Sequence, residues 1–475
     1  MPWASTAGPA LAVGSGRWSA DELGAHARET ATLLSAQGLR GGQVVLRATD
    51  DPLHLLLLQH ALAELGAGLL PYSPDLPGGA VNAIAASVGA EWRWVQGALV
   101  ATGHRPAVTA PDPPPALLVR TSGSSGAPKV VMLTTGQLLA SASRVNAALD
   151  LRRGDEWLCV LPLHHVGGLA IGWRCALAGA TLRLVAAGHD TPVAMRPCHG
   201  LPVPAGSGFD AARIAATLIA HPITHLSLVP AMLARLLELI AAPPPSLRVV
   251  LLGGQAMHPW LARRAMAAGW PLFVSYGMSE TGSMVAVGRW RDDNAPGSRV
   301  GPPLPDVTLH CAGPDEAPRV LRVRGPMLML GYADSTRQPG RGLTDGWLTT
   351  ADLCRLDADG ALRVFGRTDE LVVIGGEQVS PGAVEARLAT APGVRELVVV
   401  AVAHPDWGAT LAACWSGPAT SAALDAWCRA ELSGRERPRL FRRLDALPLL
   451  PSGKPDLATL RALVTKSSQA ADDAG

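Results

Sequence analysis

The sequence predicts an α/β protein: a large N-terminal domain of helix-covered, mostly parallel sheets plus a β-rich subdomain, and a small α+β C-terminal domain joined by a hinge. The chain has 475 residues, and at roughly 100–200 residues per domain this length points to more than one domain. Short apolar segments alternate with helical patterns up to about residue 300, which is typical of parallel sheets covered on both faces. Short strand-like segments separated by Gly, Asp and Pro turns follow.

The expected elements follow one another in a regular order. The first is an amphipathic helix over residues 20–40, with Asp21 and Glu22 at its start and Gly38 at its end. The remaining expectations for the large domain are strands at 44–48, 158–163, 181–186, 247–254 and 271–277, helices at 53–65, 167–180, 232–240 and 259–269, and β-rich segments at 305–312, 319–325 and 361–367. The C-terminal unit is expected as strand 370–376, helix 381–390, strand 394–403 and helix 420–432, followed by a disordered polar tail at 466–475. This places the domains at residues 1–368 and 369–475.

Composition and charge exclude several classes of protein. Hydrophobic residues make up 48% and charged residues 17% of the chain, enough for a large core and unlike a disordered protein. The formal net charge is +2, with both signs interspersed, so neither a nucleic-acid partner nor an anionic membrane is expected. The apolar window Leu53–Leu70 is interrupted by His54, Gln59, His60 and Glu64, which favours a buried helix over a membrane span.

The cysteines and the N-terminus indicate a cytoplasmic protein. The seven cysteines are scattered without metal-ligand spacing, and several lie in apolar runs, so buried reduced thiols are expected. The first residues lack the basic region and apolar core of a secretory signal.

The segment TSGSSGAPKVVML, from Thr121 to Leu133, has the composition of a phosphate-binding loop. Its glycines let backbone N–H groups turn inward, its hydroxyls donate hydrogen bonds, and Lys129 neutralises charge. It is not a Walker A loop, which needs a strand, G-x-x-x-x-G-K-[ST] and then a helix, because this segment connects two strand-like runs. By itself it fits a flexible surface turn at least as well.

Four further stretches bring polar residues to turn-like positions. SYGMSETG (275–282) places Tyr276 where a ring can stack on a base and Glu280 where a carboxylate can hold Mg²⁺ through one ligand. LTTADL (348–353) places Asp352 at a strand-to-turn position, where it could accept ribose hydroxyls or form an ordinary Asx turn. GRTDELVVIGGEQVSP (366–381) lies at the domain junction, and LPSGKPD (450–456) presents one lysine. A surface hinge and an exposed lysine are the ordinary alternatives for these two.

Together and in this order, TSGSSGAPK, YGMSE, TTADL, GRTDE and PSGK resemble the adenylate-forming superfamily of acyl- and aryl-CoA ligases, luciferases and peptide-synthetase adenylation domains. The resemblance covers about residues 20–465, and the combination is highly specific although each piece alone is weak. Ala351 departs from the family's usual glycine before the aspartate, which reduces backbone freedom there. Ser279 replaces the more usual threonine and keeps the hydroxyl.

The resemblance implies a role for each motif residue, with ATP, Mg²⁺ and coenzyme A as cofactors and co-substrates. Lys454 would reach the α-phosphate and the acid's carboxylate, Glu280 would bind Mg²⁺, and Asp369 would be the hinge. His165 and Ser275 would lie at the acyl pocket, although His165 could equally be a core histidine. The nucleotide would be bound by Thr121, Ser122, Gly123, Ser124, Ser125, Gly126, Lys129, Gly253, Gly254, Gln255, Tyr276, Gly277, Ser279, Asp352 and Arg367.

The implied chemistry has two half-reactions. A carboxylate attacks the α-phosphorus of ATP and releases pyrophosphate; a thiol then attacks the acyl-adenylate and releases AMP. In the family the small domain rotates between the two steps, so that Lys454 leaves and the turn at Gly375 and Gly376 arrives. The chain ends shortly after PSGKPD, which favours free CoA over an attached carrier domain.

Three stretches resemble the o-succinylbenzoate–CoA ligases of menaquinone synthesis in particular: LPLHHVGGLAIGWR (161–174), THLSLVPAML (224–233) and IGGEQVSP (374–381). The substrate of that branch has two carboxylates. Arg174 lies in an otherwise apolar helix, where a guanidinium is costly unless it meets an anion. A substrate carboxylate would be such an anion; a salt bridge to a nearby acid or snorkelling to the surface are equal alternatives.

The sequence leaves other functions open. The acid could be another aromatic or medium-chain one, or the acyl group could be loaded onto a separate carrier protein. A non-catalytic nucleotide-binding protein is the alternative that is not an enzyme. The sequence does not give the oligomeric state.

Overall fold

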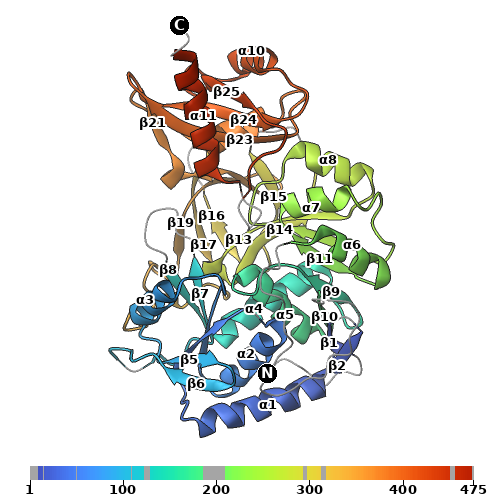
Figure 1. Ribbon diagram of the computed structural model, residues 1–475, viewed down its shortest axis with the longest axis vertical. Coiled ribbons are helices and arrows are strands. Elements are labelled where there is room, and N and C mark those ends of the chain that lie inside the picture. Colours follow the sequence, from blue (N-terminus) through green and yellow to red (C-terminus); the bar gives the residue numbers. More distant parts are fainter. Residues whose placement is uncertain are drawn as a thin grey trace.

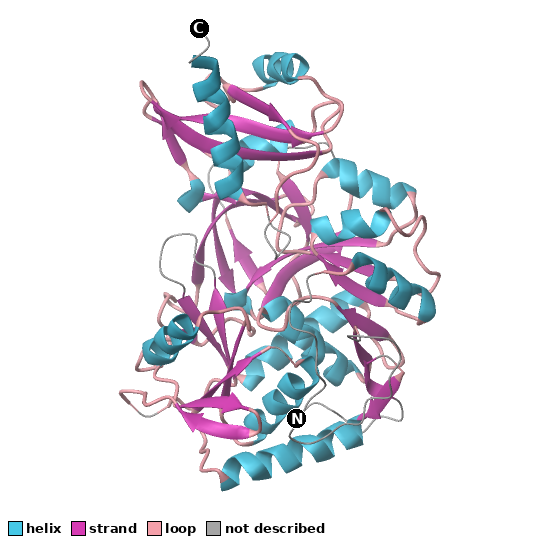
Figure 2. Ribbon diagram, in the orientation of Figure 1, coloured by secondary structure: helices cyan, strands magenta, loops and turns pink. Residues whose placement is uncertain are grey.

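Two mixed sheets with helices between them form the larger part of the molecule, and the chain after about residue 370 forms a smaller unit beside it (Figure 1). The computed structural model describes residues 9–13, 15–49, 51–108, 110–121, 129–185, 209–292, 297–311, 317–449 and 455–472. Figure 2 shows some helices of the larger part between two groups of strands and others on the outer sides of those groups. No helix within these described ranges is long and apolar enough to cross a membrane.

The larger sheet has eight strands in the order β14-β13-β12-β11-β9-β10-β1-β2. The inner strands run parallel, while β14 and β2 at the two edges pair antiparallel. Every residue of β9 to β12 is buried, as expected for parallel strands covered on both faces. The strands are β1 (Pro9–Val13), β2 (Gly16–Ser19), β9 (Glu156–Cys159), β10 (Thr181–Leu184), β11 (His225–Leu228), β12 (Val249–Leu252), β13 (Leu272–Met278) and β14 (Ser283–Arg289).

The second sheet has seven strands in the order β18-β8-β7-β4-β3-β5-β6. Its centre is parallel, and β8, β18 and β6 are antiparallel to their neighbours. The short strand β18 comes from far along the chain and pairs Tyr332 with Val131 of β8. The strands are β3 (Val44–Ala48), β4 (Gly68–Tyr72), β5 (Trp92–Val95), β6 (Ala98–Ala101), β7 (Leu117–Thr121), β8 (Lys129–Leu133) and β18 (Gly331–Tyr332).

Helices α2, α4 and α5 lie between the two sheets (Figure 1), and one core cluster contains buried residues from both sheets and from these helices. Local signals define where helices begin: Ser19 and Glu22 form a capping box on α1, and Thr134 and Gln137 form one on α4. The helices of the larger part are α1 (Ala20–Ala36), α2 (Pro52–Glu64), α3 (Gly78–Val88), α4 (Thr135–Leu149), α5 (Val166–Ala178), α6 (Ala211–Ala220), α7 (Pro230–Leu237) and α8 (Pro259–Ala267).

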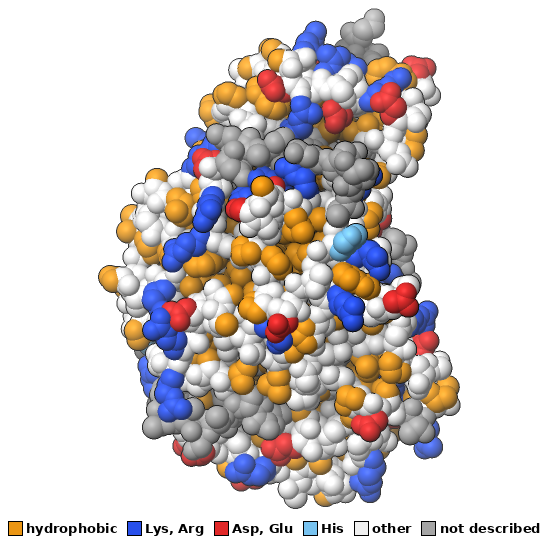
Figure 3. Space-filling view, turned by 180° about the vertical axis from the view of Figure 1, so that it is seen from behind, with side chains coloured by type: hydrophobic (Ala, Val, Ile, Leu, Met, Phe, Trp, Pro, Cys, Tyr) orange, Lys and Arg blue, Asp and Glu red, His pale blue; other side chains and the backbone are white. Residues whose placement is uncertain are grey.

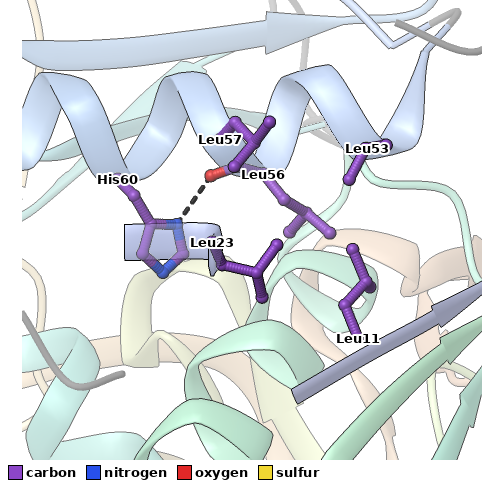
Figure 4. Close-up of a pocket in the computed structure, with 6 residues that line it drawn as sticks. All are labelled: Leu11, Leu23, Leu53, Leu56, Leu57 and His60. Atoms are coloured by element: carbon purple, nitrogen blue, oxygen red, sulfur yellow. Dashed lines mark hydrogen bonds between the residues drawn. The ribbon is translucent and has the colours of Figure 1, made fainter. Parts of the chain in front are cut away.

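Helix α2 is buried on all sides rather than amphipathic, because residues 53–62 are all buried. Beside it lies a small apolar cavity lined by His60 and by the leucines at 11, 23, 53, 56 and 57 (Figure 4). His60 is bonded through Nδ1 to the carbonyl of Leu56 at 2.6 Å. The apolar window that includes α2 is thus a core helix, as predicted.

Residues between 298 and 367 form a five-stranded antiparallel sheet in the order β15-β20-β19-β17-β16. It confirms the predicted β-rich subdomain. The strands are β15 (Ser298–Gly301), β16 (Thr308–His310), β17 (Arg319–Arg324), β19 (Leu348–Leu356) and β20 (Leu362–Arg367), and short 3₁₀ turns occur at Ser279–Thr281 and Thr368–Glu370.

The C-terminal unit contains a two-stranded and a three-stranded sheet with three helices. Two clusters of buried residues are made entirely from residues between 374 and 464, so this unit has its own core. Arg395 reaches back to the larger part, with its guanidinium carbon 5.6 Å from the centre of the Trp260 ring on α8. The elements are β21 (Val372–Ile374), β22 (Glu377–Val379), α9 (Pro381–Leu388), β23 (Glu396–His404), β24 (Gly408–Ser416), α10 (Ser421–Glu431), β25 (Leu440–Arg443) and α11 (Leu457–Asp472).

The face opposite to that of Figure 1 has hydrophobic side chains gathered across its middle, below the C-terminal unit (Figure 3). Basic and acidic side chains are interspersed around them.

The predicted α/β class is confirmed, with two corrections to single segments. Both large sheets have parallel strands at their centre, as predicted, and antiparallel strands close their edges. Asp352 lies inside β19 rather than at a strand-to-turn position, because β20 extends the ladder as far as the Asp352–Arg367 pair. Residues 466–472 continue α11 instead of forming a disordered tail, and Leu460 and Val464 earlier in the same helix lie in a core cluster.

Candidate active site

The carboxyl ends of the parallel strands bring several predicted residues to one edge of the eight-stranded sheet. His165 follows β9, residues 253–255 follow β12, and Ser275 and Tyr276 lie near the end of β13. In open α/β sheets, ligands bind outside the carboxyl ends of the strands. Residues that are separated by more than a hundred positions in the sequence therefore meet at the edge where a ligand is expected.

Two glycines at this edge allow close packing of the backbone. A Cβ on Gly253 would lie 2.7 Å from Oγ of Ser275, whose hydroxyl donates to the carbonyl of Leu252 at 3.0 Å. A Cβ on Gly277 would lie 2.1 Å from the carbonyl oxygen of Ser283 on β14. The glycines of the GGQ and SYG motifs are therefore needed for packing, because a side chain at either position would collide with Ser275 or Ser283. Gly254 adopts a positive φ of 76°, and Gln255 is half-buried.

Tyr276, Asp352, Arg367 and Asp369 form one continuous polar chain. The Tyr276 hydroxyl donates to Oδ2 of Asp352 at 2.5 Å, and Nη1 of Arg367 donates to Oδ1 of the same carboxylate at 3.1 Å. Arg367 also donates two hydrogen bonds to Asp369, at 2.9 Å and 2.8 Å. Burial and the neighbouring Asp352 raise the pKa of Tyr276, so its phenol remains a donor. The carboxylate predicted to hold ribose is thus preorganised by two partners and tied to the predicted hinge residue.

A second set of contacts links Lys129 to Glu280 through Tyr332, which was not among the predicted site residues. The hydroxyl of Tyr332 donates to Oε1 of Glu280 at 2.7 Å, and the Lys129 ammonium lies 4.8 Å from the centre of the Tyr332 ring. Burial and the nearby Glu280 raise the pKa of Tyr332. The sequence offered no signal for this tyrosine beyond an isolated Gly-Tyr pair, because its position depends on the pairing of β18 with β8.

The loop predicted to contact the polyphosphate connects two antiparallel strands, as the sequence indicated. Thr121 and Lys129 face each other across β7 and β8, and the Thr121 hydroxyl donates to the carbonyl of Lys129 at 3.4 Å. Ser279 begins the 3₁₀ turn that presents Glu280. Ser122, Gly123, Ser124, Ser125, Gly126 and Lys454 lie outside the described residues.

Arg174 lies in the middle of α5 and is only 1% exposed. Its Nη2 donates to Oγ of Ser283 at 2.6 Å, and its guanidinium carbon lies 5.3 Å from the centre of the Trp157 ring. No Asp or Glu among the described residues forms an ion pair with it, and its buried Nε has no hydrogen-bond partner there. Burial lowers the pKa of Arg174 to about 10. Snorkelling to the surface is therefore wrong, and no acid among the described residues supplies the salt bridge that was the other alternative.

The guanidinium of Arg174 is close to the nucleotide motifs. Ser283 directly follows the SYGMSETG stretch and adopts an unusual φ of 151° for a residue other than glycine. Thr281 donates to the carbonyl of Ser283 at 2.7 Å. A strained turn thus connects the buried cation of α5 to the stretch that presents Glu280.

His165 is exposed and supplies the backbone N-cap of α5. Its neighbour His164 points inward, 3.2 Å from Oγ1 of Thr49, and burial lowers the pKa of His164 to about 4. The two rings lie 4.4 Å apart. The structure therefore excludes a core role for His165 and leaves its ring accessible at the carboxyl edge of β9.

The residues present fit a divalent cation that arrives with a nucleotide. No group of three or more His, Cys, Asp or Glu side chains suitable for a metal occurs within the described ranges. Glu280 instead offers one carboxylate, near a lysine suited to phosphate. Such a single ligand suits Mg²⁺, which retains waters and takes further oxygens from substrate phosphates.

The AMP-binding enzyme family matches residues 91–333, and the AMP-binding enzyme C-terminal domain matches residues 383–454. The chain therefore belongs to the AMP-binding enzyme family. The resemblance to adenylate-forming enzymes is confirmed, and the protein is an AMP-forming ligase by class.

Several curated relatives and solved structures are similar to this chain. The 2-succinylbenzoate–CoA ligase of Bacillus mycoides is 32% identical over 356 residues, which cover 73% of this chain and 70% of that protein. The ligase of the same name from Geobacillus kaustophilus is 30% identical, with 74% of this chain and 70% of that protein covered. E. coli MenE with a bound m-phenylether-linked analogue of OSB-AMS has a TM-score of 0.75 at 27% identity and covers 97% of this chain and 96% of that one. The Bacillus subtilis o-succinylbenzoate CoA synthetase with its acyl-adenylate intermediate shares the fold, with a TM-score of 0.75, 24% identity and 95% coverage of both chains.

Proposed function

We propose that this protein is an ATP-dependent acid–CoA ligase that acts on 2-succinylbenzoate. In the first half-reaction a carboxylate oxygen of the acid attacks the α-phosphorus of ATP, the bond from that phosphorus to the bridging oxygen breaks, and pyrophosphate leaves. In the second, the CoA thiol loses its proton and attacks the acyl carbonyl, and AMP leaves with the electrons of the broken acyl–oxygen bond. Positioning and charge neutralisation, rather than covalent catalysis by the protein, lower the barrier of the first step.

Different side chains of the site would contact different parts of the nucleotide. Tyr276 would stack on adenine with its hydroxyl fixed by Asp352, and Asp352 with Arg367 would hold the ribose. Lys129 and the hydroxyl residues of 121–125 would contact the β- and γ-phosphates, with Gly253–Gln255 lining the base pocket. Glu280 would hold Mg²⁺, which neutralises negative charge on the phosphates when bound.

The observation that favours a dicarboxylic acid is the buried Arg174 with no acidic partner among the described residues. An isolated charge in such a place is destabilising unless an anion meets it. The distal carboxylate of 2-succinylbenzoate supplies that anion, and the relatives of that name make this acid the first candidate. Ser275 and His165 would line the rest of the acyl pocket.

We also propose that residues 1–368 and 369–475 are the two domains and that Asp369 is the hinge between them. The separate core of residues 374–464 supports this division. Lys454 would serve only adenylate formation.

The six described cysteines are buried and free, which supports a cytoplasmic location.

The decisive test measures AMP and pyrophosphate release from ATP, Mg²⁺ and CoA with 2-succinylbenzoate, benzoate and octanoate. We expect kcat/KM to be highest for 2-succinylbenzoate. No preference among the three acids would refute the substrate assignment. ATP binding without AMP formation from any acid would indicate a non-catalytic nucleotide-binding protein, and activity only with a phosphopantetheinylated carrier protein would identify the carrier as the thiol.

A further inference from the structure

Tyr332 occupies the space between the lysine and the carboxylate of the proposed nucleotide site. We propose that Tyr332 is a positioning residue that orients Glu280 for the divalent cation and keeps Glu280 from pairing with Lys129. This inference rests on the proposed function, because it assigns Glu280 to the cation and Lys129 to the phosphates.

Strand pairing places Tyr332 beside Lys129. Tyr332 on β18 faces Val131 on β8, and Lys129 lies two residues before Val131 on the same strand. Residues two apart on a strand share a face, so a tyrosine reaches its diagonal neighbour. The Lys129 ammonium accordingly lies 4.8 Å from the centre of the ring, within cation–π distance.

The same segment fixes Glu280 at two points. The Tyr332 hydroxyl donates to Oε1 at 2.7 Å, and the backbone N–H of Met329 donates to the Glu280 carbonyl at 2.7 Å. No described residue donates a hydrogen bond to Oε2. One carboxylate oxygen is thus satisfied by a neutral donor, and the described residues leave the other available to a cation.

The Tyr332 hydroxyl is a neutral donor, so it binds Glu280 without adding a charge to the site. Opposite charges a few ångströms apart attract each other even near a protein surface. A direct Lys129–Glu280 pair would therefore reduce the attraction of each group for its ligand. The ring satisfies Lys129 through its face and Glu280 through its hydroxyl, and it leaves both charges intact.

The orientation of Tyr332 is built into the scaffold. Its backbone N–H donates to the carbonyl of Arg341 at 2.9 Å, and a Cβ on Gly342, whose φ is 88°, would lie 2.4 Å from the ring. The following loop is anchored by the buried Arg337, whose Nη2 donates to Glu91 at 2.9 Å. A glycine at 342 and a buried ion pair both serve to hold the ring in place.

The test uses Tyr332→Phe in the full-length enzyme, which removes the hydroxyl and keeps the ring. Calorimetry gives the Kd for ATP in EDTA and in Mg²⁺, and pyrophosphate release gives the Mg²⁺ concentration at half-maximal rate. We expect that concentration, and the Kd for ATP in Mg²⁺, to rise about tenfold, as loss of a hydrogen bond to a charged group predicts. The Kd in EDTA and kcat at saturating Mg²⁺ should stay within about threefold of the wild-type values, because the bound cation itself then orients Glu280.

Two further variants separate positioning from structural support. Tyr332→Leu also removes the ring and should weaken ATP binding in EDTA as well, since Lys129 loses its contact. Tyr72→Phe removes a phenol oxygen from the same sheet, where the Tyr72 hydroxyl has no hydrogen bond to a described residue, and should change none of these quantities.

An unchanged Mg²⁺ dependence in Tyr332→Phe, or equal loss of ATP affinity with and without Mg²⁺, would overturn the proposal. Failure of the proposed function gives a different result, because the wild-type protein itself would then show no Mg²⁺-dependent release of pyrophosphate.

Discussion

Arg174 shows how a buried charge without an acidic partner among the described residues can indicate a ligand. Its guanidinium is buried between Trp157 and Ser283 without an acidic group from the described residues. Buried ions are normally paired, because removal of a charge from water costs several kcal/mol. The simplest account is that the enzyme uses this cation when the substrate is present.

Arg174→Met tests that account, because methionine keeps the apolar stem and removes the charge. We expect KM for 2-succinylbenzoate to rise about tenfold to a hundredfold, as loss of a charged hydrogen bond implies, with little change for a monocarboxylic acid. The melting temperature should not fall, since replacement of a buried ion that has no acidic partner among the described residues by an apolar residue is neutral or stabilising. A fall in melting temperature together with equal KM increases for both acids would show that Arg174 is structural.

The contrast between Arg174 and Tyr332 shows which site residues a sequence reveals. Arg174 stands out because it is a charge in an apolar helical pattern. Tyr276, Asp352 and Lys129 stand out through motifs. Tyr332 has neither signal, because its function arises from a strand pairing between residues about two hundred positions apart.

Helix α2 shows how far the sequence predicts a single secondary-structure element. Its apolar sequence predicted a buried helix, and the structure confirms this, with Asp51 accepting from the His54 N–H at the N-terminus. The sequence did not indicate that two histidines would lie among the leucines in the core. Strand β19 shows where the prediction was wrong: Asp352 was expected at a turn, but pairing with β20, visible only in three dimensions, extends the strand past it.

His60 makes the stability of this core depend on pH. Burial lowers its pKa to about 4 from 6.5, so the unfolded chain binds a proton at higher pH than the folded one. The free energy of unfolding should therefore fall as the pH drops from about 6.5 towards 4, by up to about 1.4 kcal/mol per pH unit for this group. Burial lowers the pKa of His164 and His258 to about 4 as well, and they add to the effect.

Denaturant unfolding of wild type and His60→Leu at pH 7.5 and 5.0 measures this contribution. Leucine cannot take up a proton, so the variant should lose less stability between the two pH values than the wild type. His310→Gln, at an exposed position, is the control and should keep the wild-type difference. An unchanged difference in His60→Leu would show that His60 does not titrate in this range.

At the scale of the molecule, the buried clusters of the C-terminal unit are separate from those of the larger part. The C-terminal unit has its own buried clusters, and the Arg395–Trp260 contact joins it to α8. The predicted class and order of elements followed from alternating patterns that each segment carries by itself. The contacts between units did not, because they depend on surfaces that form only after each unit has folded.

If the C-terminal unit rotates between the half-reactions, as proposed, one lysine serves only one of them. Lys454→Ala should lower the rate of adenylate formation by at least about a hundredfold, since it removes a cation from the developing charge at the α-phosphate. Conversion of preformed acyl-adenylate and CoA into thioester should remain close to the wild-type rate. Single-turnover measurements of each half-reaction decide this, and an equal loss in both steps would contradict a rotating unit.

The chain from Tyr276 through Asp352 and Arg367 to Asp369 has a thermodynamic consequence. Arg367 is shared between the carboxylate proposed to hold ribose and the residue proposed as the hinge. If a nucleotide at Asp352 changes how firmly Arg367 holds Asp369, it shifts the equilibrium between orientations of the C-terminal unit. Reciprocity then requires that whatever biases that equilibrium, including a substitution at the hinge that never touches the ligand, alters the affinity for the nucleotide by the same factor.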